Sequence, residues 1–314
     1  MFISVLDLFK IGIGPSSSHT MGPMVAAKDF RDRIQSFVTN HTVPSFLQVR
    51  CTLRGSLAFT GKGHATDRAV TLGMHEYTPQ GLAKLNVNEL FQKLWQLNTL
   101  QINQSTVIHF NPAEDIVFDR GEPLPEHPNG MIFQLLDETG KTLLTETYFS
   151  IGGGFITTLQ EIGQLVAPIK MDAVSSCGFP FDSANQMMKM SVDSGLSVAA
   201  MKRSNEMERI SEIALNEGLD AVWDAMRTCL ENGLVTEGRL PGGLNIKRRA
   251  HALYQQLQSN PEKANLNDWL CAYAMAVNEE NAAGHMVVTA PTNGAAGVIP
   301  AVIYYAVKHE GATL

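Results

Sequence analysis

The stretch Leu47–Phe59, LQVRCTLRGSLAF, decides how the first half of the chain is interpreted. Polar side chains separate its apolar ones, which are Leu47, Val49, Cys51, Leu53, Leu57 and Phe59. Because successive side chains of a strand point to opposite faces, this period of two predicts a half-buried strand.

Working outward, further segments predict strands: Thr106–Phe110, Asp115–Asp119, Met131–Leu136 and Leu143–Phe149. A hairpin turn is expected at Thr139–Lys141, between the last two. Two helices are also expected, one with Pro23 in its first turn and Ala26, Phe30, Ile34 and Phe37 on one face, the other holding Leu90, Leu94 and Leu97. This half is therefore α+β.

From about residue 180 the apolar residues recur at helical spacing. The segments concerned are Met188, Val192, Leu196 and Ala199; Leu219, Val222, Trp223, Met226 and Leu230 after a break at Gly218; and Trp269–Val277. No clear strand is visible there. The predicted fold class is α+β, with an α+β domain at 1–155, a linker at 156–180 and an all-α domain at 181–314.

Composition excludes several classes of protein. With 314 residues the chain is long enough for two domains, and 24 basic against 31 acidic residues give a net charge of −7, which argues against nucleic acid. No uninterrupted run of about 18 apolar residues exists, so no membrane span is expected. The N-terminus lacks the pattern of a signal peptide. The scattered cysteines, Cys51, Cys177, Cys229 and Cys271, suggest a reducing cytoplasm.

Two loops combine small, hydroxyl and amide residues just before a helix. Gly12–Pro23 holds Ser16, Ser17, Ser18, His19 and Thr20, and Thr289–Gly297 holds Thr292, Asn293 and Gly294. The N-terminus of a helix offers free N–H groups and a positive dipole, so either loop could hold a carboxylate. The competing interpretations are a serine-rich helix cap and a turn between helices.

Histidines in two further loops are candidates for acid–base chemistry. His64 lies in GKGHATD at 61–67, and His127 lies in EHPNG at 126–130; either could instead be an ordinary solvated side chain. The remaining candidates are weaker. Ile151–Phe155 lacks phosphate-loop spacing and is interpreted as a hinge between domains. His75, His109, His251, His285 and His309 are taken as structural.

Together these stretches resemble the bacterial iron–sulfur L-serine dehydratases (L-serine ammonia-lyases). The matching segments, in order, are GPSSSHTMGPM at 14–24, GKGHATD at 61–67, EHPNGM at 126–131, SIGGGF at 150–155, NEENAAG at 278–284 and APTNGAAGVIPAV at 290–302. The resemblance covers nearly the whole chain. It implies a first domain similar to the effector-binding domain of some phosphoglycerate dehydrogenases, followed by an all-α catalytic domain.

The resemblance further implies a 4Fe-4S cluster, no pyridoxal phosphate, and conversion of L-serine to pyruvate and ammonia in amino-acid catabolism and gluconeogenesis. An open iron would act as Lewis acid on the hydroxyl. His64 is the candidate base and His127 the candidate acid, orienting group or alternative base, while Ser16–Thr20 or Thr292–Gly294 would hold the carboxylate. The site is expected between the two domains.

No cluster ligand set is visible in this sequence, and the cluster cysteines are expected beyond Leu314. The apolar segment Pro300–Val307 also suggests a chain that a further part or a partner completes. The alternative function is therefore a catalytically silent amino-acid-binding fragment. A pyridoxal-phosphate enzyme is a third alternative, with Lys62 as its one tempting lysine. We expect a cytoplasmic homodimer with L-serine as its small-molecule substrate.

Overall fold

The computed structural model describes residues 3–82, 85–163, 177–181 and 183–313. The first half contains the sheet strands β2 (Leu47–Leu53), β3 (Thr99–Gln101), β4 (Val107–His109), β5 (Ile116–Phe118), β6 (Gly130–Asp137), β7 (Thr142–Gly152) and β8 (Phe155–Thr158). Its helices are α1 (Val5–Leu8), α2 (Gly22–Asn40), α3 (Ser56–Thr60), α4 (Thr66–Met74), α5 (Pro79–Leu82), α6 (Val87–Trp95), α7 (Pro112–Asp115) and α8 (Leu159–Ile162).

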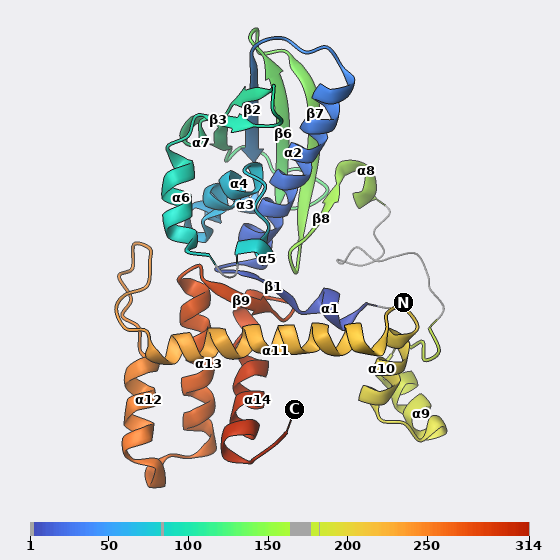
Figure 1. The fold of residues 1–314 in the computed structure, drawn as a ribbon, viewed down its shortest axis with the longest axis vertical. Helices are drawn as coiled ribbons and strands as arrows, with labels where there is room; N and C mark the ends of the chain where they lie inside the picture. The colour runs from blue at the N-terminus through green and yellow to red at the C-terminus, as the bar shows by residue number, and fades with distance from the viewer. Residues whose placement is uncertain (1–2, 83–84, 164–176, 182, 314) are drawn as a thin grey trace.

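The strands of the first half form one mixed sheet in the order β3-β4-β2-β6-β7-β8, with β5 paired to β2. Helix α2 lies along one face of this sheet (Figure 1). Side chains such as Phe30 and Ile34 of α2 pack with Val49 and Phe133 of the strands in one buried core. The predicted α+β class is thus confirmed for this half, and its core fixes the loops that leave the strand ends.

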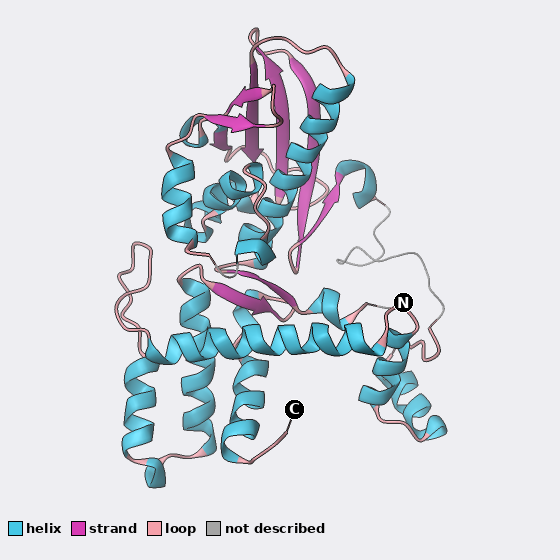
Figure 2. Cartoon of the chain, viewed as in Figure 1, coloured by secondary structure: helices cyan, strands magenta, loops and turns pink. Residues whose placement is uncertain are grey.

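The second half is helical, with α9 (Ala184–Ser194), α10 (Val198–Met207), α11 (Glu212–Val235), α12 (Ala250–Ser259), α13 (Leu266–Ala282) and α14 (Val298–His309). Figure 2 shows α11 as a long rod, with α12 and α14 extending from one side of it and α13 crossing it toward β9. Their apolar faces meet in a second core that includes Leu230, Tyr273 and Tyr304.

One strand in the helical half was not expected. Strand β9 (Met286–Thr289) pairs antiparallel with β1 (Lys10–Ile13), with Lys10 opposite Thr289. The prediction of no strand after residue 180 is therefore wrong, because four residues between two helices give no readable period. Figure 1 shows this two-stranded sheet lying between the large sheet and α11. It joins the start of the chain to its last part.

Three element boundaries also differ from the sequence expectation. The strand that begins at Leu47 ends at Leu53, because Gly55 adopts a positive φ of 56° and turns the chain into α3. Gly218 does not break α11; a Cβ there would lie 2.6 Å from Leu6, so glycine permits the close approach of α1. Gly195, with φ of 68°, divides the expected helix around Met188 and Ala199 into α9 and α10.

The domain boundaries at 155 and 180 stay a prediction. Residues 156–162 of the proposed linker lie in β8 and α8, and much of the remainder, 164–176, lies outside the described residues. No helix among the described residues has the length and apolar character needed to cross a membrane.

Candidate functional site

Residues 14–22 lie where the two halves of the chain meet. The segment follows β1 and continues through a π-helical turn, Ser17–Met21, into α2. Ser16 caps this turn, because its Oγ accepts a hydrogen bond from the backbone N–H of His19 at 3.2 Å. Thr20 Oγ1 accepts in return from the N–H of Ser16, also at 3.2 Å. These local bonds give the loop a defined shape and present His19 on its outer side.

The ring of His19 is hydrogen-bonded on both nitrogens. Nδ1 lies 2.8 Å from Ser18 Oγ, and Nε2 lies 2.9 Å from Ser56 Oγ. Burial, and the neighbouring His64, lower the pKa of His19 to about 4. At neutral pH the ring is therefore uncharged, donates to one hydroxyl and accepts from the other. Such a ring orients its partners rather than supplying charge.

The stretch 61–67 packs directly on this loop. Thr20 Oγ1 donates to the carbonyl of His64 at 2.8 Å, and Thr66 Oγ1 donates to the carbonyl of His19 at 2.6 Å. The imidazole rings of His19 and His64 have centroids 4.8 Å apart. The structure thus brings together His64 and the predicted substrate loop. Lys62 points elsewhere and pairs with Asp67 at 2.8 Å.

The stretch 126–131 reaches the loop through Ser56. The N–H of Ser56 donates to the carbonyl of Pro128 at 2.7 Å, while its hydroxyl contacts His19. A Cβ on Gly55 would lie 2.3 Å from the Pro128 carbonyl oxygen, so the two chains approach as closely as glycine allows. His127 Nδ1 accepts from the N–H of Asn129 at 3.1 Å, and burial lowers the pKa of His127.

The glycine stretch 151–155 is a turn inside the sheet. Gly152, Gly153 and Gly154 all have positive φ and connect β7 to β8, which are paired strands. The expected domain hinge is therefore wrong, since both flanking strands belong to one sheet. The turn lies against the substrate loop: a Cβ on Gly154 would be 3.2 Å from Met21, and one on Gly22 would be 2.0 Å from Ser150 Oγ.

The two stretches of the helical half meet the same loop from the other side. Asn281 Nδ2 donates to the carbonyl of Pro15 at 3.0 Å. Asn293 is 3% exposed and its Nδ2 donates to Asn281 Oδ1 at 2.9 Å, whereas Thr292 and Gly294 are exposed. The other five stretches singled out in the sequence therefore reach residues 14–22, each directly or through one intervening residue.

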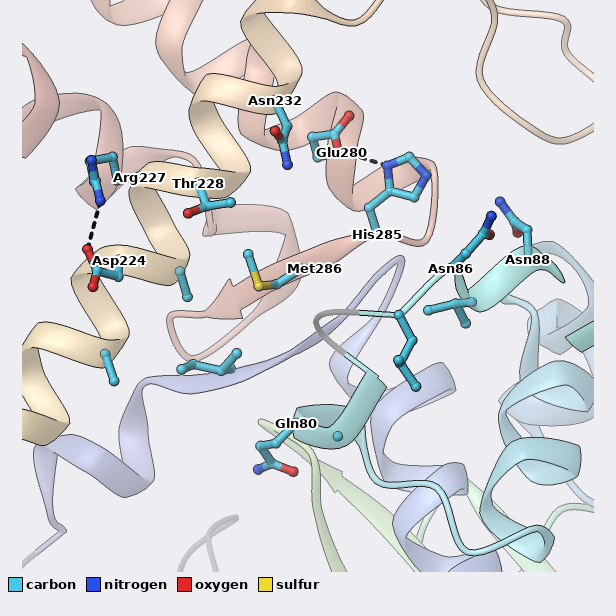
Figure 3. A pocket seen from close by; sticks show the side chains of 16 residues that line it. Gln80, Asn86, Asn88, Asp224, Arg227, Thr228, Asn232, Glu280, His285 and Met286 are labelled. Carbon is cyan, nitrogen blue, oxygen red and sulfur yellow. Dashed lines mark hydrogen bonds and ion pairs between the residues drawn. The ribbon is translucent and has the colours of Figure 1, made fainter. Parts of the chain in front are cut away.

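A separate cleft of about 1300 Å³ opens beside this assembly, between α5–α6 and α11. Figure 3 shows His285 and Glu280 on one wall and Asn86 and Asn88 opposite. The described residues that line it do not include His64 or His127. His285, taken as structural from the sequence, is thus the histidine that faces the cleft.

Glu280 carries a buried charge at the edge of that cleft. It bonds Arg248 at 2.6 Å, with both side chains 4% exposed, and His285 Nδ1 at 2.8 Å. Burial alone would raise the pKa of Glu280, but hydrogen bonds and charges from His285 and Arg248 outweigh it and hold that pKa below its usual value. Its neighbour Glu279 accepts from the N–H of Arg249 at 2.7 Å and so caps α12.

The cysteines of the described chain do not form a cluster site. Cys51 and Cys229 are buried, and burial raises the pKa of both thiols, which disfavours the thiolate that iron needs. Cys271 is exposed and Cys177 precedes α9. Among the described residues no three His, Cys, Asp or Glu side chains are grouped as metal ligands. These residues therefore do not fit a 4Fe-4S cluster.

Sequence reasoning missed Ser56, and it included Thr289 in a candidate loop without giving its hydroxyl a role. The alternation that began at Leu47 assigned Ser56 to the solvent face of a strand, and only the turn at Gly55 redirects it to His19. Thr289 is both the first residue of the candidate loop Thr289–Gly297 and the last residue of β9, and the strand was not expected. Asn281 was included in the sequence analysis only as part of the matching segment NEENAAG at 278–284.

The chain thus consists of an α+β part and a helical part, and loops from both parts form one polar site. A family model described as the serine dehydratase beta chain matches residues 4–161, and one described as the serine dehydratase alpha chain matches 193–313. The chain belongs to the serine dehydratase family.

Individual relatives agree with this assignment. The chain is 41% identical to the L-serine dehydratase of Streptomyces coelicolor over 97% of its own length, 39% identical to that of Haemophilus influenzae over 96%, and 41% identical to L-serine dehydratase TdcG of Escherichia coli over 96%. It spans 66% of the length of each of these relatives.

Proposed function

We propose that this chain carries the L-serine ammonia-lyase activity for which its relatives are named, releasing pyruvate and ammonia from L-serine. The single observation that carries the proposal is the convergence of five separate stretches on a sixth, residues 14–22, at the junction of the two halves, each directly or through one intervening residue. The relatives named L-serine dehydratase support it. Nothing in those comparisons favours a catalytically silent amino-acid-binding fragment.

Dehydration of serine requires loss of the α-proton, and the hydrogen bonding of His64 suits a base. Its Nδ1 lies 3.0 Å from the carbonyl oxygen of Thr60, and a carbonyl can only accept. In the neutral ring the proton therefore resides on Nδ1, and Nε2 keeps its lone pair. We assign proton abstraction to His64 Nε2.

His127 has the complementary tautomer. Because its Nδ1 accepts from the N–H of Asn129, the proton of the neutral ring resides on Nε2. Its lowered pKa keeps the ring neutral at physiological pH. We assign His127 as the group that donates a hydrogen bond to the substrate, either as acid or as orienting group.

The substrate carboxylate is assigned to Ser16–Thr20 or to Thr292–Gly294. Ser17, 6% exposed, opens the helical segment that continues into α2, where the helix dipole attracts an anion. The buried Asn293 contributes through the loop it supports.

On the family resemblance we include a 4Fe-4S cluster as cofactor, a homodimer and a cytoplasmic location in this proposal, with a role in amino-acid catabolism and gluconeogenesis. No described residue is assigned as a cluster ligand. The proton transfers above depend only on His64, His127 and their hydrogen-bond partners.

The test is an anaerobic assay, after incubation with ferrous iron and sulfide, of the chain joined to the part of the Streptomyces coelicolor relative that it does not span, because the described residues alone do not fit the cluster. The proposal predicts pyruvate and ammonia in equal amounts from L-serine. His64→Ala is the test variant, and His41→Ala, at the exposed end of α2, is the matched control. Product formation that is absent in the parent, or equal in the parent and His64→Ala, contradicts the proposal.

A further inference from the structure

A chain of buried polar side chains links the helical half to the substrate loop. Thr289 Oγ1 donates to Asn293 Oδ1 at 2.8 Å, Asn293 Nδ2 donates to Asn281 Oδ1 at 2.9 Å, and Asn281 Nδ2 donates to the carbonyl of Pro15 at 3.0 Å. The three side chains are 0%, 3% and 7% exposed in that order. We name this chain the Thr289–Asn293–Asn281 relay.

The hydrogen bonds of the relay require an amide side chain at position 281. Asn281 must accept from Asn293 and donate to Pro15, so an amide fits where a carboxylate, which cannot donate when ionised, does not. Buried polar groups are costly unless paired, so a fully paired set of this kind fixes its members in one arrangement. The relay is therefore a rigid connection rather than a flexible contact.

The backbone next to the relay is packed without spare room. The N–H of Gly14 donates to the carbonyl of His285 at 2.9 Å, and a Cβ on Gly14 would lie 1.9 Å from the carbonyl oxygen of Asn281. Thr289 Oγ1 also lies 3.2 Å from Met21 Sδ, at the far end of the loop. Both ends of the loop are thus held by the helical half.

We propose that Asn281, supported by Asn293 and Thr289, is a positioning residue that holds residues 14–22 in the arrangement that places His19 between Ser18 and Ser56. The consequence for chemistry rests on the proposed function, since it is the loop of that site which is held. The environment of the His19 ring can be measured without enzyme turnover.

The experiment follows the His19 imidazole by NMR of the chain labelled with ¹⁵N-histidine, titrated with acid. In the parent, His19 titrates near pH 4 because it is buried beside His64. In Asn281→Ala the loop is no longer held, the ring gains water, and its pKa rises by roughly one pH unit or more toward the ordinary value near 6.5. Thr289→Val keeps the shape of the side chain and removes its hydroxyl, and it raises the His19 pKa by a smaller amount. This variant replaces Asn281→Ala in the test if Asn281→Ala does not fold.

Two controls isolate the effect. Asn267→Ala changes an exposed asparagine of the same helix and leaves the His19 pKa where it is in the parent. His75 is an internal reference, because its pKa is held at about 4 by burial and by Arg31, and it stays there in every folded variant.

An unchanged His19 pKa in the folded relay variants overturns the proposal, as does an equal change at His75, which would indicate general loosening. If the parent is active, Asn281→Ala additionally raises KM for L-serine by about tenfold, with kcat changed less, since the loop binds the carboxylate in ground and transition states alike. A shifted His19 pKa in a protein without any lyase activity would uphold the relay and reject the proposed function, so the two claims fail separately.

Discussion

Replacing Arg248 by methionine leaves the Glu280 carboxylate buried with one of its two partners missing. Both side chains are 4% exposed and their charged atoms are 2.6 Å apart, so the pair is largely shielded from water. Removing one partner of a buried pair costs about 3–5 kcal/mol, because the remaining charge is uncompensated. Methionine keeps most of the volume, so the loss is electrostatic rather than a cavity.

The assay is urea unfolding followed by tryptophan fluorescence, since Trp223 and Trp269 pack against the core of the helical half. With a slope of about 3 kcal/mol per molar urea, the expected loss lowers the midpoint by about 1–2 M. Lys93→Met, which breaks the exposed ion pair with Glu89, is the control and leaves the midpoint nearly unchanged.

The pH dependence of that loss supplies a second check. In the parent, the Glu280 pKa lies below its unfolded value, so its stabilising contribution is present above about pH 4.5 and is lost as the pH falls through the folded pKa. Without Arg248 the pKa rises and the carboxyl can become neutral. The difference between variant and parent must therefore shrink on acidification. A midpoint shift below about 0.3 M at pH 7, or a difference that grows in acid, refutes the reasoning.

Three further outcomes follow from the site. His64→Ala lowers turnover by about 10² or more if its Nε2 is the base, and an unchanged turnover number at saturating L-serine removes it from the mechanism. Gly14→Ala places a Cβ 1.9 Å from the Asn281 carbonyl oxygen and lowers the free energy of unfolding in urea by about 1–3 kcal/mol. The control, Gly243→Ala, has open space around its Cβ and leaves that free energy unchanged. Equal unfolding midpoints for the two variants contradict the close packing at Gly14. Burial lowers the pKa of His19, His75 and His127, so the folded state resists their protonation. Their contribution to stability is therefore complete above about pH 6.5 and is lost as the pH falls toward 4. A thermal midpoint that stays constant over that range contradicts this prediction.

Much of the fold was predictable because its signals are local. The alternation around Val49 and Cys51 and the apolar face of α2 each arise from one periodic element, and both lie in the core as expected. Strand β9 was not predictable, since its pairing partner β1 lies more than 270 residues earlier and only the assembled chain creates it.

The candidate site was likewise predictable in its loops but not in the side chains that connect them. The loops around His19, His64 and His127 stand out through glycine, proline and hydroxyl residues, which bias the backbone locally. Ser56 and Thr289 contribute single hydroxyl groups that become meaningful only when distant backbone brings them to His19 and Asn293. Sequence patterns name the loops, whereas tertiary packing decides which side chains connect them.

The most direct test of the central claim, that the loops around residues 14–22 form one site for L-serine, is titration of the ¹⁵N-histidine-labelled chain with L-serine. The account predicts saturable changes in the ring resonances of His19 and His64, which lie 4.8 Å apart, and none at His41, which lies beyond the far end of α2. If L-serine leaves His19 and His64 unchanged at millimolar concentration, or shifts all three histidines alike, the assignment of this site is contradicted.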